Sequence, residues 1–451
     1  MHSVRTGRPV GREDLAPASA WLRLAPACLD GIAAAALALA PFWWHLSILE
    51  PEDLTDVTAV FSTVAVYPSA VCLALLALGG LAVLVARRRQ RPAWPLRPVA
   101  LGVVALPVAA LLSALAASEP VLAAGLAGHL ALLGLAWFAV GVAPVSAAWL
   151  ALGVVCSACV EAALAVAQFV AQQPVVPDRL ALPWLPAADV TLGGTPVVLD
   201  PAGERLLRAF GTFPHPNILG GYLALGVVLL PLLVTTKRRA WLGLPVGVLL
   251  ATGLIVSFSR AAWLAAAVGL GVWWLATSAR QAAWRWLLPG LALAALVLVF
   301  SPLGGVVGVR LSPTPANELE RGSIEQRVAL DRQALTLIKR HPTLGVGAGN
   351  FGEASLEEGL QAVFGEPAHS VPLLIVAELG VPGALAGASL VLGLALLAWR
   401  DPRTLAPGLA VCCALGVLML LDHYPWTMAP GRVIAWAPLA VVAALGSRMA
   451  R

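Results

Sequence analysis

Apolar residues form long, nearly uninterrupted blocks along most of this 451-residue chain. A helix needs roughly 20 apolar residues to cross the hydrocarbon core of a bilayer, and twelve blocks reach that length. Their centres lie near Ala38, Leu76, Leu106, Leu132, Ala163, Leu225, Leu249, Ala267, Leu293, Ala384, Ala414 and Ala440. The pattern predicts an all-α polytopic membrane protein with about twelve transmembrane helices. Basic residues precede the first block as in a signal peptide, but its length and its bulky end at Pro41-Phe42-Trp43-Trp44 favour a retained anchor.

Two polar stretches, residues 173–215 and 303–369, are too long to be simple connections between spans. The first is rich in proline, which forbids a long helix and favours an irregular, strand-containing flap. The stretches divide the chain into five parts. These are an N-terminal bundle of five spans (1–172), the flap (173–215), spans six to nine (216–302), a long extracytoplasmic loop (303–369) and spans ten to twelve (370–451).

The long loop contains one predicted helix. Ser323-Ile324-Glu325-Gln326 matches a capping box with Ser323 as N-cap, and His341-Pro342 predicts that the helix stops near Arg340. Its apolar positions face either the bundle or the lipid surface, and they are Ile324, Val328, Leu335 and Ile338.

Composition and charge support the membrane assignment and fix an orientation. The chain is 59% hydrophobic and 12% charged, with a mean hydropathy of +0.85, which excludes a soluble domain. If the N-terminus is cytoplasmic, more than half of the 29 basic residues fall in short inside segments. The acidic residues inside would be only Glu13, Asp14, Asp30 and Asp401 of 24. Both termini are therefore predicted to lie in the cytoplasm.

The net charge, the cysteines and the short motifs do not predict a nucleic-acid, disulfide, metal or nucleotide site. The net charge of +5 comes from the cytoplasmic clusters, so it predicts contact with anionic lipid headgroups and no nucleic-acid partner. All six cysteines lie in or beside spans, so no disulfide framework is expected. No Asp-x-Asp or His-x-x-His cluster offers a metal site, and no cofactor is expected. Gly345-Val346-Gly347-Ala348-Gly349 follows a helix, so we expect a tight turn there and no nucleotide loop.

Residues suited to substrate chemistry gather on the predicted outer side of the membrane. The strongest string is Arg208-Ala209-Phe210-Gly211-Thr212-Phe213-Pro214-His215-Pro216-Asn217, in which Asn217 is expected to cap the sixth span. Arg260 lies in the short turn between spans seven and eight, and Arg327 lies in the loop helix. The other candidates lie near the outer ends of the last three spans, and they are His369, Glu378, Asp422 and His423.

The order and spacing of these strings resemble the O-antigen ligase and polymerase superfamily of bacterial membrane glycosyltransferases, over roughly residues 200–435. The resemblance implies a donor glycan carried on undecaprenyl pyrophosphate and its transfer outside the cytoplasmic membrane. It implies the helical fold of integral-membrane glycosyltransferases (GT-C-like), without metal or nucleotide. It also implies functional roles for Arg260, Arg327 and His369 and a basic position at Arg208.

The chemistry of the residues agrees with that implication. A guanidinium binds phosphate oxygens in a bidentate manner, so converging arginines can stabilise a pyrophosphate leaving group. An acceptor hydroxyl needs a base, and an imidazole with an ordinary pKa of about 6.5 suits that role. We predict catalytic roles for His369, Arg260 and Arg327, with inversion at the anomeric carbon. The predicted substrate-binding residues are Arg208, His215, Asn217, Glu378, Asp422 and His423.

Each of these residues also has a structural interpretation. An arginine at a membrane edge can bind lipid phosphate or snorkel, Arg327 can pair with acids on its own helix, and His369 can begin a helix. His215 and His341 precede proline and are typical of structural positions. His129 and Glu161 lie within spans, where buried hydrogen bonding is the expected role.

Two other classes of protein remain open at this stage. A transporter or flippase for lipid-linked oligosaccharides would also hold arginines against pyrophosphate, although it requires no convergence of Arg260, Arg327 and His369. A receptor or scaffold would present a flat outer surface. The acceptor, whether glycan, lipid or protein, is not encoded in these motifs.

Overall fold

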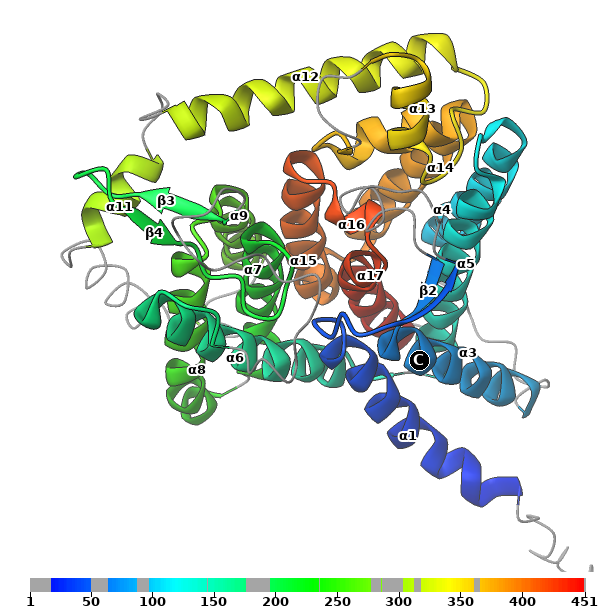
Figure 1. Ribbon diagram of the computed structural model, residues 1–451. Coiled ribbons are helices and arrows are strands. Elements are labelled where there is room, and N and C mark those ends of the chain that lie inside the picture. Colours follow the sequence, from blue (N-terminus) through cyan, green and yellow to red (C-terminus); the bar gives the residue numbers. More distant parts are fainter. Residues whose placement is uncertain are drawn as a thin grey trace, which may run out of the picture.

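The computed structural model describes residues 18–49, 64–86, 97–143, 145–175, 195–234, 236–276, 285, 303–311, 318–360 and 366–449. Helices dominate these ranges (Figure 1). The helices from the N-terminus to the middle of the chain are α1 (Ala18–Ala38), α3 (Pro68–Ala86), α4 (Arg97–Ser113), α5 (Pro120–Val142), α6 (Ala147–Ala171), α7 (Pro216–Leu233), α8 (Lys237–Val256) and α9 (Arg260–Ala276). Those of the C-terminal part are α11 (Leu303–Leu311), α12 (Glu318–Arg340), α13 (Phe351–Glu357), α14 (Val371–Arg400), α15 (Pro402–Leu421), α16 (Tyr424–Thr427) and α17 (Ala429–Met449).

Nine of the described helices are long and apolar enough to cross a membrane, which confirms the prediction of an all-α polytopic membrane protein. Two shorter apolar helices, Leu24–Ala38 and Arg260–Ala276, correspond to two further predicted spans. The predicted span centred near Leu293 lies outside the described residues. The count of twelve and the GT-C-like fold stay predictions.

Within the described ranges, four short strands form two hairpins beside the bundle. β1 (Leu46–Leu49) pairs with β2 (Val64–Val66), and β3 (Val197–Leu199) pairs with β4 (Arg205–Leu207), both antiparallel. The second hairpin lies in the predicted flap, whose residues 176–194 lie outside the described part of the chain. Arg208 directly follows β4, and its backbone N donates to Pro196 O at 2.9 Å.

Helix α7 is the most enclosed of the candidate spans, with 83% of its apolar window buried. It packs against α6, α8, α9 and α15, and small residues allow these close approaches. A Cβ on Gly220 would meet the Ser257 side chain at 2.8 Å. Because α7 is surrounded by other helices, the residues at its start are held firmly in place.

Helix α12 crosses one end of the bundle, on the side away from the start of α1 (Figure 1). It ends at Arg340 as predicted, but it begins at Glu318, so the prediction of Ser323 as N-cap was wrong. The residues from 318 to 321, Glu-Leu-Glu-Arg, favour helix and extend it toward the N-terminus.

The face of α12 that packs on the bundle also differs from the prediction. Leu330, Ala334 and Leu337 are fully buried there, whereas Ile324, Val328 and Leu335 are each at least 40% exposed. Ile338 alone of the predicted face packs against the core beneath the helix. The three exposed apolar side chains therefore do not pack on the bundle, and the alternative of a lipid-facing surface stays a prediction.

Helix α14 is broken at Gly380, where φ is 61° and ψ is −149°. The turn after α12 fits into this break. Val346 N donates to Ala377 O at 3.0 Å, Gly347 N donates to Glu378 O at 2.9 Å, and Val381 N donates to Pro342 O at 3.0 Å. The prediction of a tight turn is confirmed, because Gly345, Gly347 and Gly349 all have positive φ.

Candidate active site

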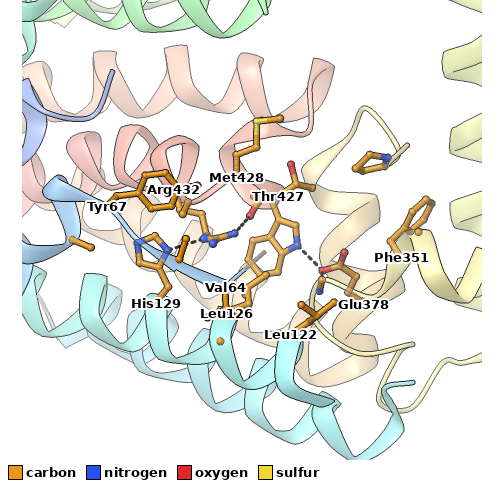
Figure 2. Close-up of a pocket in the computed structure, with 18 of the residues that line it drawn as sticks. Val64, Tyr67, Leu122, Leu126, His129, Phe351, Glu378, Thr427, Met428 and Arg432 are labelled. Carbon is orange, nitrogen blue, oxygen red and sulfur yellow. Dashed lines mark hydrogen bonds between the residues drawn. The ribbon is translucent and has the colours of Figure 1, made fainter. Parts of the chain in front are cut away.

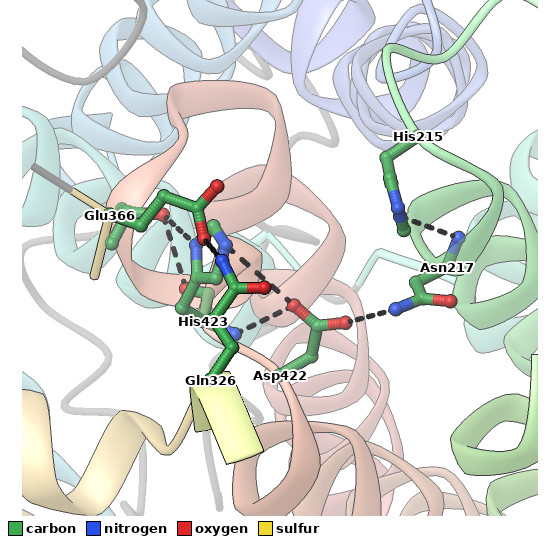
Figure 3. Close-up of polar contacts among 7 residues, drawn as sticks. His215, Asn217, Gln326, Glu366, Asp422 and His423 are labelled. Carbon is green, nitrogen blue, oxygen red and sulfur yellow. Dashed lines mark hydrogen bonds and ion pairs between the residues drawn. The ribbon is translucent and has the colours of Figure 1, made fainter. Parts of the chain in front are cut away.

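The start of α7 links two charged residues that are 214 positions apart in the sequence. The Asn217 side chain accepts a hydrogen bond from Arg208 Nη2 at 2.8 Å and donates one to Asp422 Oδ2 at 3.0 Å. Figure 3 shows this amide between the α7 start and Asp422. The predicted cap was wrong, because His215 is the N-cap and its Nδ1 accepts from Asn217 N at 3.1 Å. Asn217 therefore connects the two charged groups and leaves capping to His215.

The C-terminal end of α8 holds two arginines through backbone carbonyls. Arg208 Nε donates to Ser257 O at 3.1 Å and its Nη2 to Phe258 O at 3.5 Å. Arg310 Nη2, from α11, donates to the same Phe258 carbonyl at 3.2 Å. Phe258 has a φ of 50°, so the chain turns sharply between α8 and α9. Arg310 was not among the predicted residues, because it follows an apolar stretch and no motif marks it.

Four arginines from separate segments act on one another at this point. Burial lowers the pKa of the Arg208 guanidinium, and the charges of Arg310, Arg327 and Arg260 lower it further, while Asp422 raises it. The structure thus brings Arg260 from the α8–α9 turn and Arg327 from α12 into the electrostatic reach of Arg208. Such crowding of like charges favours binding of an anion.

His369 and His423 stand beside the arginines. Their rings meet edge to face, with centroids 5.0 Å apart at an interplanar angle of 89°. His423 N donates to Asp422 Oδ1 at 2.8 Å, and His423 Nδ1 and the Thr427 hydroxyl lie 2.8 Å apart in a hydrogen bond. Figure 3 shows that Asp422 contacts both this histidine and Asn217.

Burial governs the protonation of these groups. It lowers the pKa of His369 to about 4, against the opposing effect of Asp422, and it also lowers the pKa of His423. The expectation of an ordinary histidine pKa was therefore wrong. Burial raises the pKa of the Asp422 carboxyl, but the neighbouring histidines and Arg327 outweigh it and bring that pKa below its ordinary value. The resting site holds neutral imidazoles beside an ionised carboxylate.

The same three side chains meet the basic requirement of a cation site. One ligand atom each from His369, Asp422 and His423 lie within 4.8 Å of one another, and imidazole and carboxylate are ordinary ligands of divalent metals. The search for short motifs missed this cluster because its members come from two distant segments. The Asp422 oxygens already accept hydrogen bonds from His423 N and Asn217 Nδ2.

The segment before His369 is tied to α12. Gln326 Nε2 donates to Glu366 Oε2 at 2.6 Å (Figure 3), so the side chain expected to complete a capping box instead fixes the approach to α14. Arg327, the next residue of α12, lowers the pKa of His369. This link holds α12 near the histidines.

Glu378 supports the site from α14. Its Oε2 accepts from Gly349 N at 2.9 Å and from Trp426 Nε1 at 2.7 Å, and the side chain is only 1% exposed. The carboxylate fixes the glycine turn on one side and α16, which follows His423, on the other. In the described part of the chain, Arg432 is the arginine that acts electrostatically on Glu378.

Two buried residues of α6 position the string before α7. Gln168 Oε1 accepts from Gly211 N at 2.8 Å, and Glu161 accepts from Thr212 N at 2.9 Å and from Thr212 Oγ1 at 2.7 Å. The expectation of buried hydrogen bonding for Glu161 is confirmed. His341, also expected to be structural, bonds through Nε2 to the Glu358 carboxylate.

Comparison with known families agrees with this site. Residues 245–388 match the family model described as O-Antigen ligase, which confirms the resemblance to the O-antigen ligase and polymerase superfamily. The matched residues include Arg260, Arg327, His369 and Glu378. The other site residues lie outside them, and these are Arg208, His215, Asn217, Asp422 and His423. No curated protein matches the chain.

Proposed function

We propose, from the O-antigen ligase domain at residues 245–388, that this membrane protein transfers a glycan from an undecaprenyl-pyrophosphate donor to an acceptor hydroxyl. In this proposal the reaction takes place on the outer side of the cytoplasmic membrane, which is the orientation that the distribution of basic residues in the loops predicts for this end of the bundle. The acceptor distinguishes a ligase from a polymerase.

The observation that carries the proposal is the convergence of Arg260, Arg310 and Arg327 on Arg208, with Asp422 as the carboxylate that opposes their effect on it. A pyrophosphate group supplies several negative charges, and guanidinium groups match its oxygens in geometry. The bound donor compensates the repulsion among the arginines. Charge grows on the leaving group as the glycosidic bond breaks, so the arginines stabilise the transition state more than the ground state.

His369 acts as the base. Its neutral imidazole takes the proton of the acceptor hydroxyl as the hydroxyl oxygen bonds to the anomeric carbon. The bond from that carbon to the phosphate oxygen breaks on the opposite face, and its electron pair leaves with undecaprenyl pyrophosphate. The anomeric configuration is inverted. Asp422 favours the imidazolium that forms, because its charge raises the pKa of His369.

The remaining polar residues position this pair of groups. Asn217 connects Asp422 to Arg208, and His215 fixes the start of α7. The mechanism needs neither nucleotide nor metal, because the donor already carries its leaving group and the arginines provide the positive charge.

The test is transfer of glycan from a lipid-linked donor by the purified protein in nanodiscs, comparing wild type with His369→Ala. General-base catalysis contributes roughly 10²–10⁴-fold, so the variant should transfer about 10²-fold more slowly or worse while it still binds donor. His341→Ala is the matched control, since this histidine lies on the same loop and bonds to Glu358.

A flippase would give the opposite pattern. Donor would cross the membrane of liposomes, no product would form with any acceptor, and His369→Ala would leave the movement unchanged. That result would refute the catalytic role of His369 and the proposed transfer.

A further inference from the structure

A second polar pocket adjoins the histidines, and none of the four arginines of the proposed donor site lines it. We call it the Tyr67 pocket, and its polar side chains include Tyr67, His129, Glu353, Glu378 and Arg432. Figure 2 shows Tyr67 and His129 at one end and Glu378 at the other, with Arg432 between them. The pocket is therefore separate from the arginines that the proposed function assigns to the pyrophosphate.

The arginine of this pocket is already balanced by its neighbours. Arg432 and Glu378 act on each other electrostatically. Arg432 also donates from Nε to His129 Nδ1 at 3.1 Å and from Nη1 to Trp426 O at 2.7 Å. These contacts compensate the guanidinium charge, so the pocket does not require an anion.

A second carboxylate makes an anionic ligand unfavourable. Glu353 lines the pocket beside Glu378, and the charges of Glu119 and Glu357 act on it. A ligand with a phosphate or carboxylate group would be repelled by these acids, because like charges at short distance oppose binding. The pocket therefore suits a ligand without negative charge.

The lining combines hydrogen-bonding groups with aromatic rings. Tyr67 contributes a hydroxyl and Glu353 a carboxylate, and within the described ranges neither group forms a hydrogen bond with another residue. The rings of Trp43, Phe351 and Trp426 line the same space. Sugar rings complement such a lining, because their hydroxyls both donate and accept and their C–H faces pack against aromatic rings.

The size of the pocket also fits a sugar. It encloses about 110 Å³. One water molecule needs about 10–15 Å³ on this measure, so the space holds roughly seven to ten water-sized groups. That is the size of a single hexose ring with its hydroxyls.

The pocket reaches the proposed base through α16. Pro367 and Thr427 line it, and the Thr427 hydroxyl hydrogen-bonds to the His423 ring. The centroid of that ring lies 5.0 Å from the centroid of the His369 ring. A sugar in the pocket therefore lies next to the histidines, where one of its hydroxyls can approach His369.

The pocket joins the matched O-antigen ligase domain to the rest of the chain. Phe351, Glu353 and Glu378 lie within residues 245–388, whereas Tyr67 and Arg432 lie outside them. The family match therefore assigns no role to a large part of this lining, which belongs to the N-terminal segment and to α17.

We propose that the Tyr67 pocket binds an uncharged sugar ring of the acceptor, the ring that carries the attacking hydroxyl. This rests on the proposed function and deepens it, because it names a glycan as the acceptor in place of a protein side chain. The sugar hydroxyls donate to Glu353 and accept from Tyr67. A site built to hydrogen-bond a hydroxyl rejects analogues that lack it, so the pocket selects the acceptor.

The test measures binding of methyl hexosides to the purified protein in nanodiscs by saturation-transfer-difference NMR. The probes are the methyl glycosides of glucose, galactose, mannose and N-acetylglucosamine. At least one of them should bind to wild type. The methyl uronoside of the sugar that binds best differs by one carboxylate, and it should bind several-fold more weakly because of Glu353 and Glu378.

Two conservative variants locate the binding site. Tyr67→Phe should raise the dissociation constant of the hexoside about three- to ten-fold, the usual effect of one neutral hydrogen bond. Glu353→Gln should raise it about ten-fold or more, because hydrogen bonds to a charged group are stronger. The matched control is Glu357→Gln, which changes an exposed acid of the same short helix outside the pocket and should bind as wild type does.

The tyrosine variant keeps the test valid if Glu353→Gln does not fold. It retains the ring, whose centroid lies 5.2 Å from that of His45, and removes only the hydroxyl. In the transfer assay Tyr67→Phe should raise the acceptor KM by the same factor and leave the donor KM unchanged.

The two proposals can fail separately, because binding requires no turnover. If no hexoside bound to wild type, or if Tyr67→Phe and Glu353→Gln both bound it as wild type does, the acceptor-sugar site would be overturned. A wild-type protein that binds the hexoside as expected but transfers glycan to no acceptor would overturn the proposed function.

Discussion

Asp422→Asn tests the centre of the site, because this carboxylate lies beside both histidines and accepts a hydrogen bond from Asn217, which links it to Arg208. The substitution preserves the oxygen that accepts from His423 N at 2.8 Å. It replaces the oxygen that accepts from Asn217 Nδ2 at 3.0 Å by a second amide donor. Asn217 cannot rotate its amide to compensate without losing the 2.8 Å hydrogen bond from Arg208.

The magnitude follows from what is lost. One hydrogen bond to a charged group contributes about 1.5–3 kcal/mol, so the free energy of unfolding should fall by roughly that amount. The charge that raises the pKa of His369 also disappears, so this pKa falls further below about 4 and the imidazole becomes a weaker base. We expect kcat to fall by about 10²-fold. The donor KM should not increase, because the substitution removes a negative charge beside the arginines.

A double variant that exchanges the residues at positions 217 and 422 separates the effect of Asp422 on stability from its effect on the reaction rate. In Asn217→Asp combined with Asp422→Asn, the carboxylate moves to position 217, where it accepts from Arg208 and from the amide at position 422. The hydrogen-bond chain is complete again, and thermal unfolding in nanodiscs should return close to that of wild type. The charge no longer lies next to the histidines, so kcat in the transfer assay should stay low.

Two results would refute this reasoning. If Asp422→Asn left kcat unchanged, the carboxylate would have no influence on the base. If the exchanged pair recovered kcat together with its melting temperature, Asp422 would serve only as a structural link between α7 and α16.

Three further results are expected. Burial lowers the pKa of His369 to about 4, so the imidazole is neutral above that pH, and kcat/KM should be flat from about pH 8 to 5 and fall below it; a break near 6.5 in the pH profile would contradict the buried base. Treatment with EDTA should leave the transfer rate unchanged, whereas loss of activity that Zn²⁺ or Mn²⁺ restores would make His369, Asp422 and His423 a metal centre. Gly380→Ala should lower the free energy of unfolding by about 2–4 kcal/mol, because φ at Gly380 is 61° and the new Cβ would meet Thr343 O at 2.5 Å. The control is Gly387→Ala in the same helix, whose new Cβ meets nothing within 4 Å, so this variant should melt as wild type does.

The membrane-spanning helices could be predicted from the sequence because each depends on a local property, the length of an apolar run. A run of about 20 apolar residues is sufficient to predict a span, and nine described helices match such runs. The end of α12 at Arg340 could also be predicted from nearby residues, since Pro342 cannot continue a helix. The start of α12 was predicted wrongly, because the helix-forming residues from 318 to 321 outweighed the capping signal at Ser323.

The site was only partly readable because its geometry depends on contacts between distant segments. Arg310 ends an apolar stretch without a motif, and its position becomes meaningful only through Phe258, 52 residues earlier. Asn217 precedes a helical run and resembles a cap, yet its amide is directed at Arg208 and Asp422. The pKa of His369 depends on burial, which the residue type does not reveal.

The hydrogen bonds that hold Arg208 and Arg310 explain how this site can remain positively charged before the proposed donor binds. The last carbonyls of a helix have no partner within the helix, and its C-terminal end carries partial negative charge. Here the carbonyls of Ser257 and Phe258, just beyond the end of α8, accept from Arg208 and Arg310. Phe258 adopts a left-handed conformation at this turn, at a cost of order 1 kcal/mol.

Neutral carbonyls orient the guanidinium groups without cancelling their charge, which carboxylates in the same places would do. Among the described residues, Asp422 is the acid that raises the pKa of Arg208, and it is connected to that arginine through the Asn217 amide. The carboxylate therefore remains next to His369 and His423, where its charge favours protonation of the proposed base, His369. The turn after α8 thus orients Arg208 and Arg310, while the segment between α15 and α16 holds the negative charge where the proposed proton transfer needs it.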